Sequence, residues 1–265
     1  MKFFLNNRTL KLYQAFENTL IDIGEITLLF FKSMNTILKR PFENKVFFNQ
    51  MKEIGIRSMP VVTLTCLFTG MVFSLQSYIG FKRFGAEIYT GSIVGIGLTK
   101  ELIPVLTALM IAGRVGSAMA AEIGTMKVTE QIDALLTLGT NPIKYLIVPR
   151  ILAATIMTPI LTIYGDAIGL IGAYFVAVYL MGLNPIVYNE FQLAYMEVWD
   201  ILSGLIKSFS FGVIISLIGC YKGLKTEGGA EGVGKSTTSA VVLASILILI
   251  TNFFWGKLLP FTLKK

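Results

Sequence analysis

Long apolar runs constrain this chain more than any other feature of its sequence. Residues 59–80 contain no charged side chain, and other runs reach the ~20 residues that an α-helix needs to cross a bilayer. Charged residues make up 15% of the chain, against about 25% in soluble domains. Backbone polar groups inside lipid must be satisfied within the protein, so runs of this length predict helices. We therefore expect an all-α integral membrane protein.

Five runs can serve as transmembrane spans, at residues 59–80, 91–121, 145–180, 201–220 and 240–259. The third run is too long for one upright span and short for two spans with a turn. Loop charges decide between these readings. Residues 182–200 hold acids without Lys or Arg, whereas residues 221–239 hold Lys222, Lys225 and Lys235. Loops rich in Lys and Arg stay on the cytoplasmic side of the membrane. One long third span, with the N-terminus on the cytoplasmic side, places both loops as this rule requires. The C-terminus is then outside, which the Lys264–Lys265 pair fits poorly.

The N-terminal part is predicted to lie on the membrane. Apolar residues recur every three to five positions between residues 8 and 32, which is typical of an amphipathic helix lying in the interface. Lys39-Arg40-Pro41 should end this helix, and a polar linker should continue to Arg57. We thus divide the chain into residues 1–57, the interfacial helix and linker, and residues 58–265, the five-span domain. A core-facing helix of a small soluble domain is the alternative.

Basic residues give the chain a net charge of +7, and nine of the 23 Lys and Arg precede the first span. This placement suits an anionic membrane surface and does not indicate nucleic-acid binding. The cysteines, Cys66 and Cys220, lie in apolar runs, and the chain has no histidine. Neither cysteine has metal-ligand spacing, so we expect structural thiols and no metal or other cofactor.

Three charged residues fall inside predicted spans, namely Lys100, Glu101 and Lys207. A charge inside the hydrocarbon is costly without a partner. Glu101 and Lys207 lie at similar depths below the outer surface, so we expect them to pair, within one chain or across a dimer. Lys100 should face water or a lipid headgroup. A purely structural ion pair is the alternative to a functional one. Pro104 should kink the second span just beyond this point.

Residues 229–236 read GAEGVGKS and fit the phosphate-binding pattern G-x-x-x-x-G-K-[ST]. That loop needs a parallel strand leading into a helix, and the two flanking spans leave no room for one. We expect a glycine-rich cytoplasmic turn that does not bind nucleotide.

The polar stretch from Arg114 to Arg150 separates the second and third spans. Residues 120–138 are predicted to form one helical segment on the inner surface, closed by Gly139, Asn141 and Pro142. Its apolar side can pack on the spans, and its polar side faces the cytoplasm. Such a helix can receive force from an ATPase subunit, or it can be a mere interfacial connector. The candidate coupling residues are Glu122, Gly124, Met126, Lys127, Glu130, Gln131 and Asp133.

At these residues the sequence resembles a known family. The runs ELIPVLTALMIAGRVGSAMAAEIGTMKVTEQIDAL and LGTNPIKYLIVPRILA are similar to the MlaE-type permeases of ABC lipid transporters, which include the chloroplast trigalactosyldiacylglycerol permease. The glycine-rich stretch at residues 228–237 also matches that family. The resemblance covers roughly residues 51–259.

The resemblance implies a homodimeric five-span permease with an interfacial helix, two cytoplasmic ATPase subunits and an MCE-domain lipid-binding partner. It implies that residues 122–135 are the coupling helix and that Lys100, Glu101 and Lys207 match the family's intramembrane charges. Where many relatives have an acid in span five, this chain has Asn252, so a contact there with Lys100 is not carried over. A plastid inner envelope or a bacterial inner membrane would be its location.

The function expected is therefore that of a permease moving glycerolipids or phospholipids between membranes, with ATP hydrolysis in a partner. Spans one, two and five should line a cavity at the dimer interface. An ion-coupled secondary transporter or channel is the alternative. A membrane-embedded lipid enzyme would need a nucleophile or metal cluster, and the sequence offers no catalytic residues.

Overall fold

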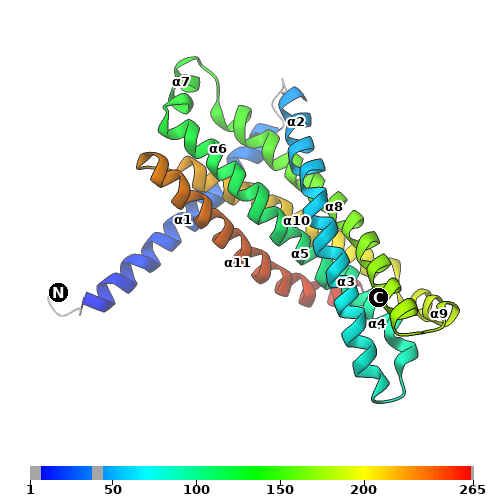
Figure 1. Cartoon of the computed structure of the whole chain (residues 1–265). Coiled ribbons are helices and arrows are strands. Elements are labelled where there is room, and N and C mark those ends of the chain that lie inside the picture. Colours follow the sequence, from blue (N-terminus) through cyan, green and yellow to red (C-terminus); the bar gives the residue numbers. More distant parts are fainter. Residues whose placement is uncertain (1–6, 38–43, 264–265) are drawn as a thin grey trace.

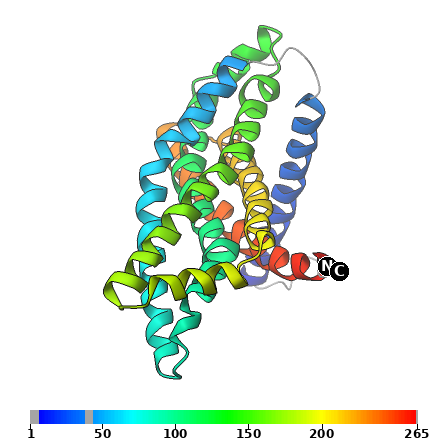
Figure 2. The ribbon, with the colours of Figure 1, turned by 90° about the vertical axis from the view of Figure 1, so that its right-hand side faces the viewer.

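Five helical segments in residues 7–37 and 44–263, which the computed structural model describes, are long and apolar enough to cross a membrane. They are Asn44–Lys82, Glu87–Val128, Ile143–Leu180, Val198–Leu224 and Gly229–Leu259, and we call them spans one to five. The described residues contain no strand, so the predicted all-α membrane fold is confirmed. Figures 1 and 2 show the last turns of α11 (Gly229–Leu263) towards the end of the bundle that lies away from α7 (Gln131–Thr137), as five spans require.

Span one is longer than predicted at its cytoplasmic end. The expected polar linker contains the helix α2 (Asn44–Ile54) and the short turn η1 (Ile56–Ser58), which lead into α3 (Met59–Lys82). Pro60 lies in the first turn of α3, where a missing N–H costs little. Ile54 is buried against spans two and three, which explains why this polar-looking segment folds as a helix. The predicted break at Lys39-Arg40-Pro41 lies outside the described residues.

Span two is one unbroken helical run with two wider turns. It consists of η2 (Glu87–Tyr89), α4 (Thr90–Gly97), η3 (Leu98–Leu102), α5 (Ile103–Ile111), η4 (Ala112–Gly116) and α6 (Ser117–Val128). The segments η3 and η4 are π-helical turns. Pro104 is the second residue of α5, just after η3, and a proline in a helix interior removes one backbone hydrogen bond. The π-helical turn η3 therefore lies next to the position of the predicted kink at Pro104.

Span three is a single helical segment made of η5 (Ile143–Ile147), α8 (Val148–Phe175) and η6 (Val176–Leu180), which confirms the prediction of one long span. Small residues let its backbone approach α3 closely. A Cβ on Gly70 would lie 2.0 Å from the Gly169 carbonyl oxygen, and one on Gly172 would lie 2.6 Å from that of Leu67. Such contacts between backbones stabilise helix pairs in lipid, where no hydrophobic effect drives association.

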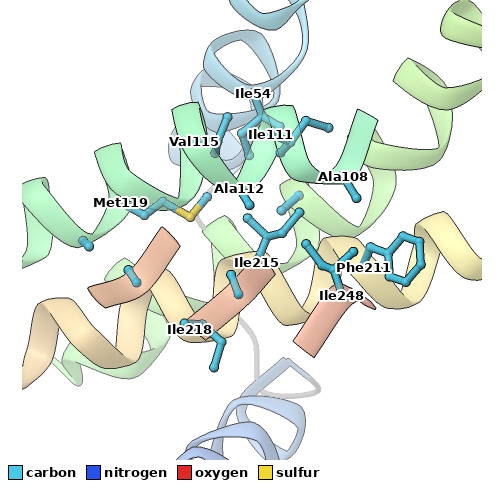
Figure 3. Packing of buried hydrophobic residues seen from close by; sticks show 14 of the residues in the cluster. Ile54, Ala108, Ile111, Ala112, Val115, Met119, Phe211, Ile215, Ile218 and Ile248 are labelled. Atoms are coloured by element: carbon cyan, nitrogen blue, oxygen red, sulfur yellow. The ribbon is translucent and has the colours of Figure 1, made fainter. Parts of the chain in front are cut away.

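The main core lies between spans two, four and five (Figure 3). Ala112 of span two lies against Ile215 of α10 (Val198–Leu224), which is span four, whereas Ile111 and Val115 lie on the side of Ile54. On the outer side, α9 (Pro185–Tyr195) packs against α4, where Gly91 and Gly95 leave space for Tyr188 and Gln192. Burial raises the pKa of Tyr188 to about 12, so this phenol stays neutral.

The glycine-rich stretch is helical and does not form the predicted turn. The helix α11 (Gly229–Leu263) begins at its first glycine, so residues 229–236 are the first two turns of span five. The turn is confined to residues 225–228, with positive φ at Gly228. Since no strand precedes this helix in the described chain, the G-x-x-x-x-G-K-S run lacks the geometry of a phosphate-binding loop.

The helix α1 (Asn7–Ile37) crosses the direction of the spans, as Figures 1 and 2 show together. Asp22 and Glu25 of α1 attach it to the cytoplasmic end of α10. The Tyr221 hydroxyl donates to both acids at 2.7 and 2.8 Å, and Lys222 Nζ donates to Asp22 at 2.8 Å. Lys225 also binds both carboxylates. This arrangement suits a helix that lies in the interface while fixed to the bundle.

These contacts predict an acid-sensitive attachment of α1. Burial alone would raise the pKa of Asp22, but hydrogen bonds from Lys222, Tyr221 and Lys225 lower it from 3.8 to about 2. The stabilisation is therefore present above pH ~4 and is lost as the pH falls towards 2. Asp22→Asn should lower the free energy of unfolding at pH 7 by about 1 kcal/mol, allowing for solvent screening.

Thermal unfolding of the detergent-solubilised protein at pH 7 and at acid pH measures this difference. The gap between wild type and Asp22→Asn should shrink on acidification. Glu17→Gln, an exposed change on the same helix, is the control. Equal midpoints for Asp22→Asn and wild type at pH 7 would contradict the prediction.

Candidate functional site

Lys207 of α10 is enclosed at the contact between spans two and four. Its side chain is 1% exposed, and its Nζ donates to Glu101 Oε1 at 2.6 Å and to the Lys100 carbonyl oxygen at 3.1 Å. That carbonyl lies four residues before Pro104, whose nitrogen carries no hydrogen to bind it. The ammonium therefore satisfies a backbone acceptor that the proline leaves free. The predicted pairing of Glu101 with Lys207 occurs within one chain.

Glu101 lies at the edge of this cluster and is accessible from outside the chain. Its side chain is 42% exposed, and its Oε2 accepts a hydrogen bond from Asn252 Nδ2 of α11 at 3.2 Å. The span-five residue thus contacts Glu101 and not Lys100. Because Asn252 is neutral, this contact adds no charge to the cluster. Spans two, four and five meet at one carboxylate.

Lys100 does not simply face water or a headgroup, as the sequence suggested. Its Nζ donates to Asp200 Oδ1 at 3.1 Å, with about a third of the lysine side chain exposed. Asp200 also caps the start of α10 by accepting from the Glu197 N–H. The two pairs together carry no net charge, which lowers the cost of placing four ionised groups near the hydrocarbon. Sequence reasoning missed Asp200, whose position at the first turn of a span was the available signal.

The cluster lies in the outer part of the membrane in the orientation that loop charges predict. Lys207 is seven residues from Asp200, or about 10 Å along α10. A hollow of about 430 Å³ opens beside it, lined by Phe68, Val72 and Phe73 of α3 and by Leu102 next to Glu101. Its mostly apolar walls, which also include Thr69 and Gln76, suit acyl chains.

The predicted coupling segment is two helices and not one. The first, α6, is the end of span two, and the second is α7 (Gln131–Thr137). Thr129 and Glu130 separate them, and Glu130 has a φ of 60°, a left-handed conformation that a non-glycine residue seldom adopts. Figure 1 shows α7 at the cytoplasmic extreme of the molecule. Gly139, with a φ of 72°, follows α7 and redirects the chain towards span three.

Glu122 faces span three, and its partner there was missed in the sequence. Arg150 of α8 is buried and donates from Nη2 to Glu122 Oε2 at 2.8 Å and from Nη1 to the Leu146 carbonyl at 2.8 Å. Glu122 therefore holds the end of span two against span three. Its role cannot be contact with a partner alone, because its removal leaves a buried guanidinium without an ion partner.

Some of the other candidate coupling residues pack against neighbouring helices, and the rest are exposed. Gly124 allows close contact with Thr226, since a Cβ would lie 2.6 Å from Thr226 Oγ1, and Met126 packs against the adjoining core. Lys127 Nζ bonds Asp133 at 3.3 Å and so bridges the break between α6 and α7. Glu130 and Gln131 are exposed. Leu136 and Leu138 are exposed beside them and were not predicted.

The described residues contain no group of three or more His, Cys, Asp or Glu that could hold a metal ion. Cys66 and Cys220 are free and buried, on α3 and α10. The chemistry that this site offers is therefore ionic contact and hydrogen bonding along an apolar surface.

Comparison with known proteins places this geometry in a family. Residues 47–258 match the family described as Permease MlaE. A probable ABC transporter permease of Rickettsia typhi is 49% identical over 238 residues, which cover 90% of this chain and 92% of that protein. A probable ABC transporter permease of Synechocystis is 47% identical over 218 residues, 82% of this chain and 83% of that protein.

A chloroplast protein of Arabidopsis thaliana, named TRIGALACTOSYLDIACYLGLYCEROL 1, is 42% identical over 219 residues. These residues cover 82% of this chain and 62% of that protein. The family match spans more than half of the chain, and the Rickettsia relative is covered almost in full. The chain belongs to the MlaE permease family.

Proposed function

We propose that this chain is the membrane-spanning permease subunit of an ABC transporter that moves glycerolipids or phospholipids between membranes, driven by a separate ATPase subunit. The observation that carries the proposal is that span two (Glu87–Val128) bears Glu101 in its outer half and Glu122 near its cytoplasmic end. These residues are 21 positions apart, or about 32 Å of helix. One helical run thus joins the polar contact in the outer leaflet to the cytoplasmic segment.

Lipid is the substrate class that the outer site fits. The hollow between α3 and Leu102 is mostly apolar, and the exposed carboxylate of Glu101, the neighbour of Leu102 in the sequence, can contact a headgroup. Two relatives are named probable ABC transporter permeases, and the third carries the name of a glycolipid, trigalactosyldiacylglycerol. A chain of this class performs no hydrolysis itself. Its location is a bacterial inner membrane or a plastid inner envelope.

The assembly that we propose contains two copies of this chain, cytoplasmic ATPase subunits and an MCE-domain lipid-binding protein. An ABC transporter permease implies an ATPase partner by its name. Spans one and five are the least buried within the chain, which leaves their surfaces for a second copy and for lipid. A cavity between copies would then be lined by spans one, two and five. The ATPase would act on α7 and the exposed residues Glu130, Gln131 and Asp133.

An ion-coupled secondary transporter or channel remains the second candidate, favoured by Asp166. This residue lies in the middle of span three, and neither carboxyl oxygen has a hydrogen-bond partner among the described residues. Such a group could bind an ion or a proton. Transport in vesicles without an ATPase, lost in Asp166→Asn, would support this reading.

Co-purification tests the assembly. The tagged chain is extracted in mild detergent, and its bound subunits and lipids are identified by mass spectrometry. We expect an ATPase, an MCE-domain protein and diacyl lipids. An active preparation that contains no ATPase would contradict the proposal.

The charge cluster should be required for transport. Glu101→Ala and Lys207→Ala should each reduce ATP-dependent lipid transfer about tenfold or more, because either change leaves a charge near the hydrocarbon without its partner. The swapped pair Glu101→Lys with Lys207→Glu should recover part of the activity. Lys144→Ala, a change of a cytoplasmic lysine, is the control. Transfer assays between vesicles that are unaffected by either single change would contradict a role in transport.

Two acids of the cytoplasmic segment should behave differently. Asp133→Arg should weaken ATPase co-purification and leave the thermal midpoint within the error of the wild type, because Asp133 is exposed and makes only a surface pair. Glu122→Arg should instead destabilise the chain by about 1–3 kcal/mol, since it places a like charge against buried Arg150. Thermal unfolding and pull-down on the same samples separate these effects. Equal thermal midpoints for the two variants would contradict the assignment of Glu122.

A further inference from the structure

A second hollow lies away from the charge cluster, between α1 and α11. It has a volume of about 1110 Å³, and Lys222 of α10 is one of its lining residues. In Figure 1 α1 passes behind α11, and Figure 2 shows the first turns of α11 apart from α1, so the hollow lies between two separated helices. We call this hollow the α1–α11 groove. It shares no lining residue with the charge cluster or with the hollow beside α3.

The α1–α11 groove changes polarity along its length. Its deeper walls are aliphatic side chains of α1 and α11, namely Ile23, Ile26, Val242, Leu243, Ile246 and Leu247. Its shallower end holds Lys222, Lys235, Thr238 and Ser239, with the acids Asp22 and Glu231. From Glu231 to Leu247 the groove follows α11 for about 24 Å. This length matches one leaflet, whose hydrocarbon half is about 15 Å deep beneath its headgroups.

The polar end lies at the level of the cytoplasmic headgroups. Lys222 is in the last turn of α10, and Lys235 is in the second turn of α11, on either side of the short turn at residues 225–228. Basic residues at this level attract anionic lipid in the inner leaflet. Lys207 and Glu101 lie in the other half of the membrane, so the two sites are separate.

Lys235 is the residue in the groove that is available to an anion. Asp22 is engaged by Lys222 and Lys225, whereas Lys235 pairs with Glu231 at 2.7 Å and with no other acid in the part of the chain that the structure describes. Both of these side chains are more than three-quarters exposed, and such surface pairs hold weakly and exchange readily. Thr238 and Ser239 are exposed one turn deeper; the Thr238 hydroxyl donates to the Gly234 carbonyl at 3.2 Å, and Ser239 adds a second hydroxyl. The groove thus offers a cation and hydroxyls above an aliphatic cleft.

We propose that the α1–α11 groove binds a phospholipid of the cytoplasmic leaflet, with its phosphate at Lys235 and its acyl chains against Ile246. An amphipathic ligand satisfies both ends of the groove. A transmembrane helix from a second copy would fill the aliphatic part but would leave the charged end to an apolar surface, which is costly. This second lipid site goes beyond the proposed function and does not depend on ATP-driven transport.

Photolabelling tests the proposal on the full chain in nanodiscs. The discs contain phosphatidylcholine with a small fraction of phosphatidylglycerol that carries a diazirine on one acyl chain. Mass spectrometry of the digested protein should find the label on α11 near Ile246 and on α1 near Ile26. Ile246→Trp, which fills the groove, and Lys235→Glu, which repels the phosphate, should each reduce this label about tenfold.

Matched controls keep the test decisive. Leu249→Trp adds the same bulk on an exposed part of α11 outside the groove, and Lys144→Glu reverses a lysine elsewhere on the cytoplasmic side; both should label as wild type does. If Ile246→Trp fails to fold, competition with unlabelled phosphatidylglycerol on the wild type gives the same information. Glycerol phosphate should not compete, because it lacks acyl chains.

Two results would overturn the proposal. Equal labelling of Ile246→Trp and Leu249→Trp would show that the groove holds no lipid. Efficient disulfide crosslinking between two Ile246→Cys chains, with no groove label on the wild type, would show that a second copy covers it.

Discussion

The need to satisfy every polar group inside lipid organises this molecule. Pro104 leaves the Lys100 carbonyl without its helical donor, and the Lys207 ammonium fills that position while it binds Glu101. Glu101 in turn accepts a hydrogen bond from Asn252. The Lys100 carbonyl is thus connected to side chains from spans two, four and five. Removal of any member would leave a buried group unpaired, which is more costly in hydrocarbon than in water. The same contacts that hold the spans together therefore create the polar point that a lipid headgroup can reach.

Close backbone packing provides the rest of the frame. Gly70 and Gly169 bring spans one and three into contact, and Gly212 does the same for spans four and three. These contacts leave the outer surfaces of spans one and five for lipid and for other chains. Span three is held at its cytoplasmic end by Arg150, which fixes Glu122 and hence the last turns of span two. A force applied at α7 thus enters a helix whose far end carries Glu101.

The features that could be predicted from the sequence are those that follow from long apolar runs and from the charges of the loops. The sequence predicted five spans, one long third span, and the pair formed by Glu101 and Lys207, because depth in the membrane follows from position along a helix. It could not predict contacts that depend on how helices are rotated against each other. Lys100 with Asp200 and Glu122 with Arg150 are of this kind. The break at Glu130 was also missed, since a glutamate gives no local signal for a left-handed conformation.

The helix α10 connects the functional surfaces that these contacts define. It carries Lys207 in the outer charge cluster, Lys222 in the lining of the α1–α11 groove, and Leu224 in a hollow beside α7. Tyr221, Lys222 and Lys225 of its last turns also hold Asp22 of α1, which forms one wall of that groove. Because a packed helix moves as a unit, a displacement of α10 caused at α7 must change the position of α1 against α11. Lipid bound in the inner leaflet and force received from the cytoplasm would therefore act on the same helix.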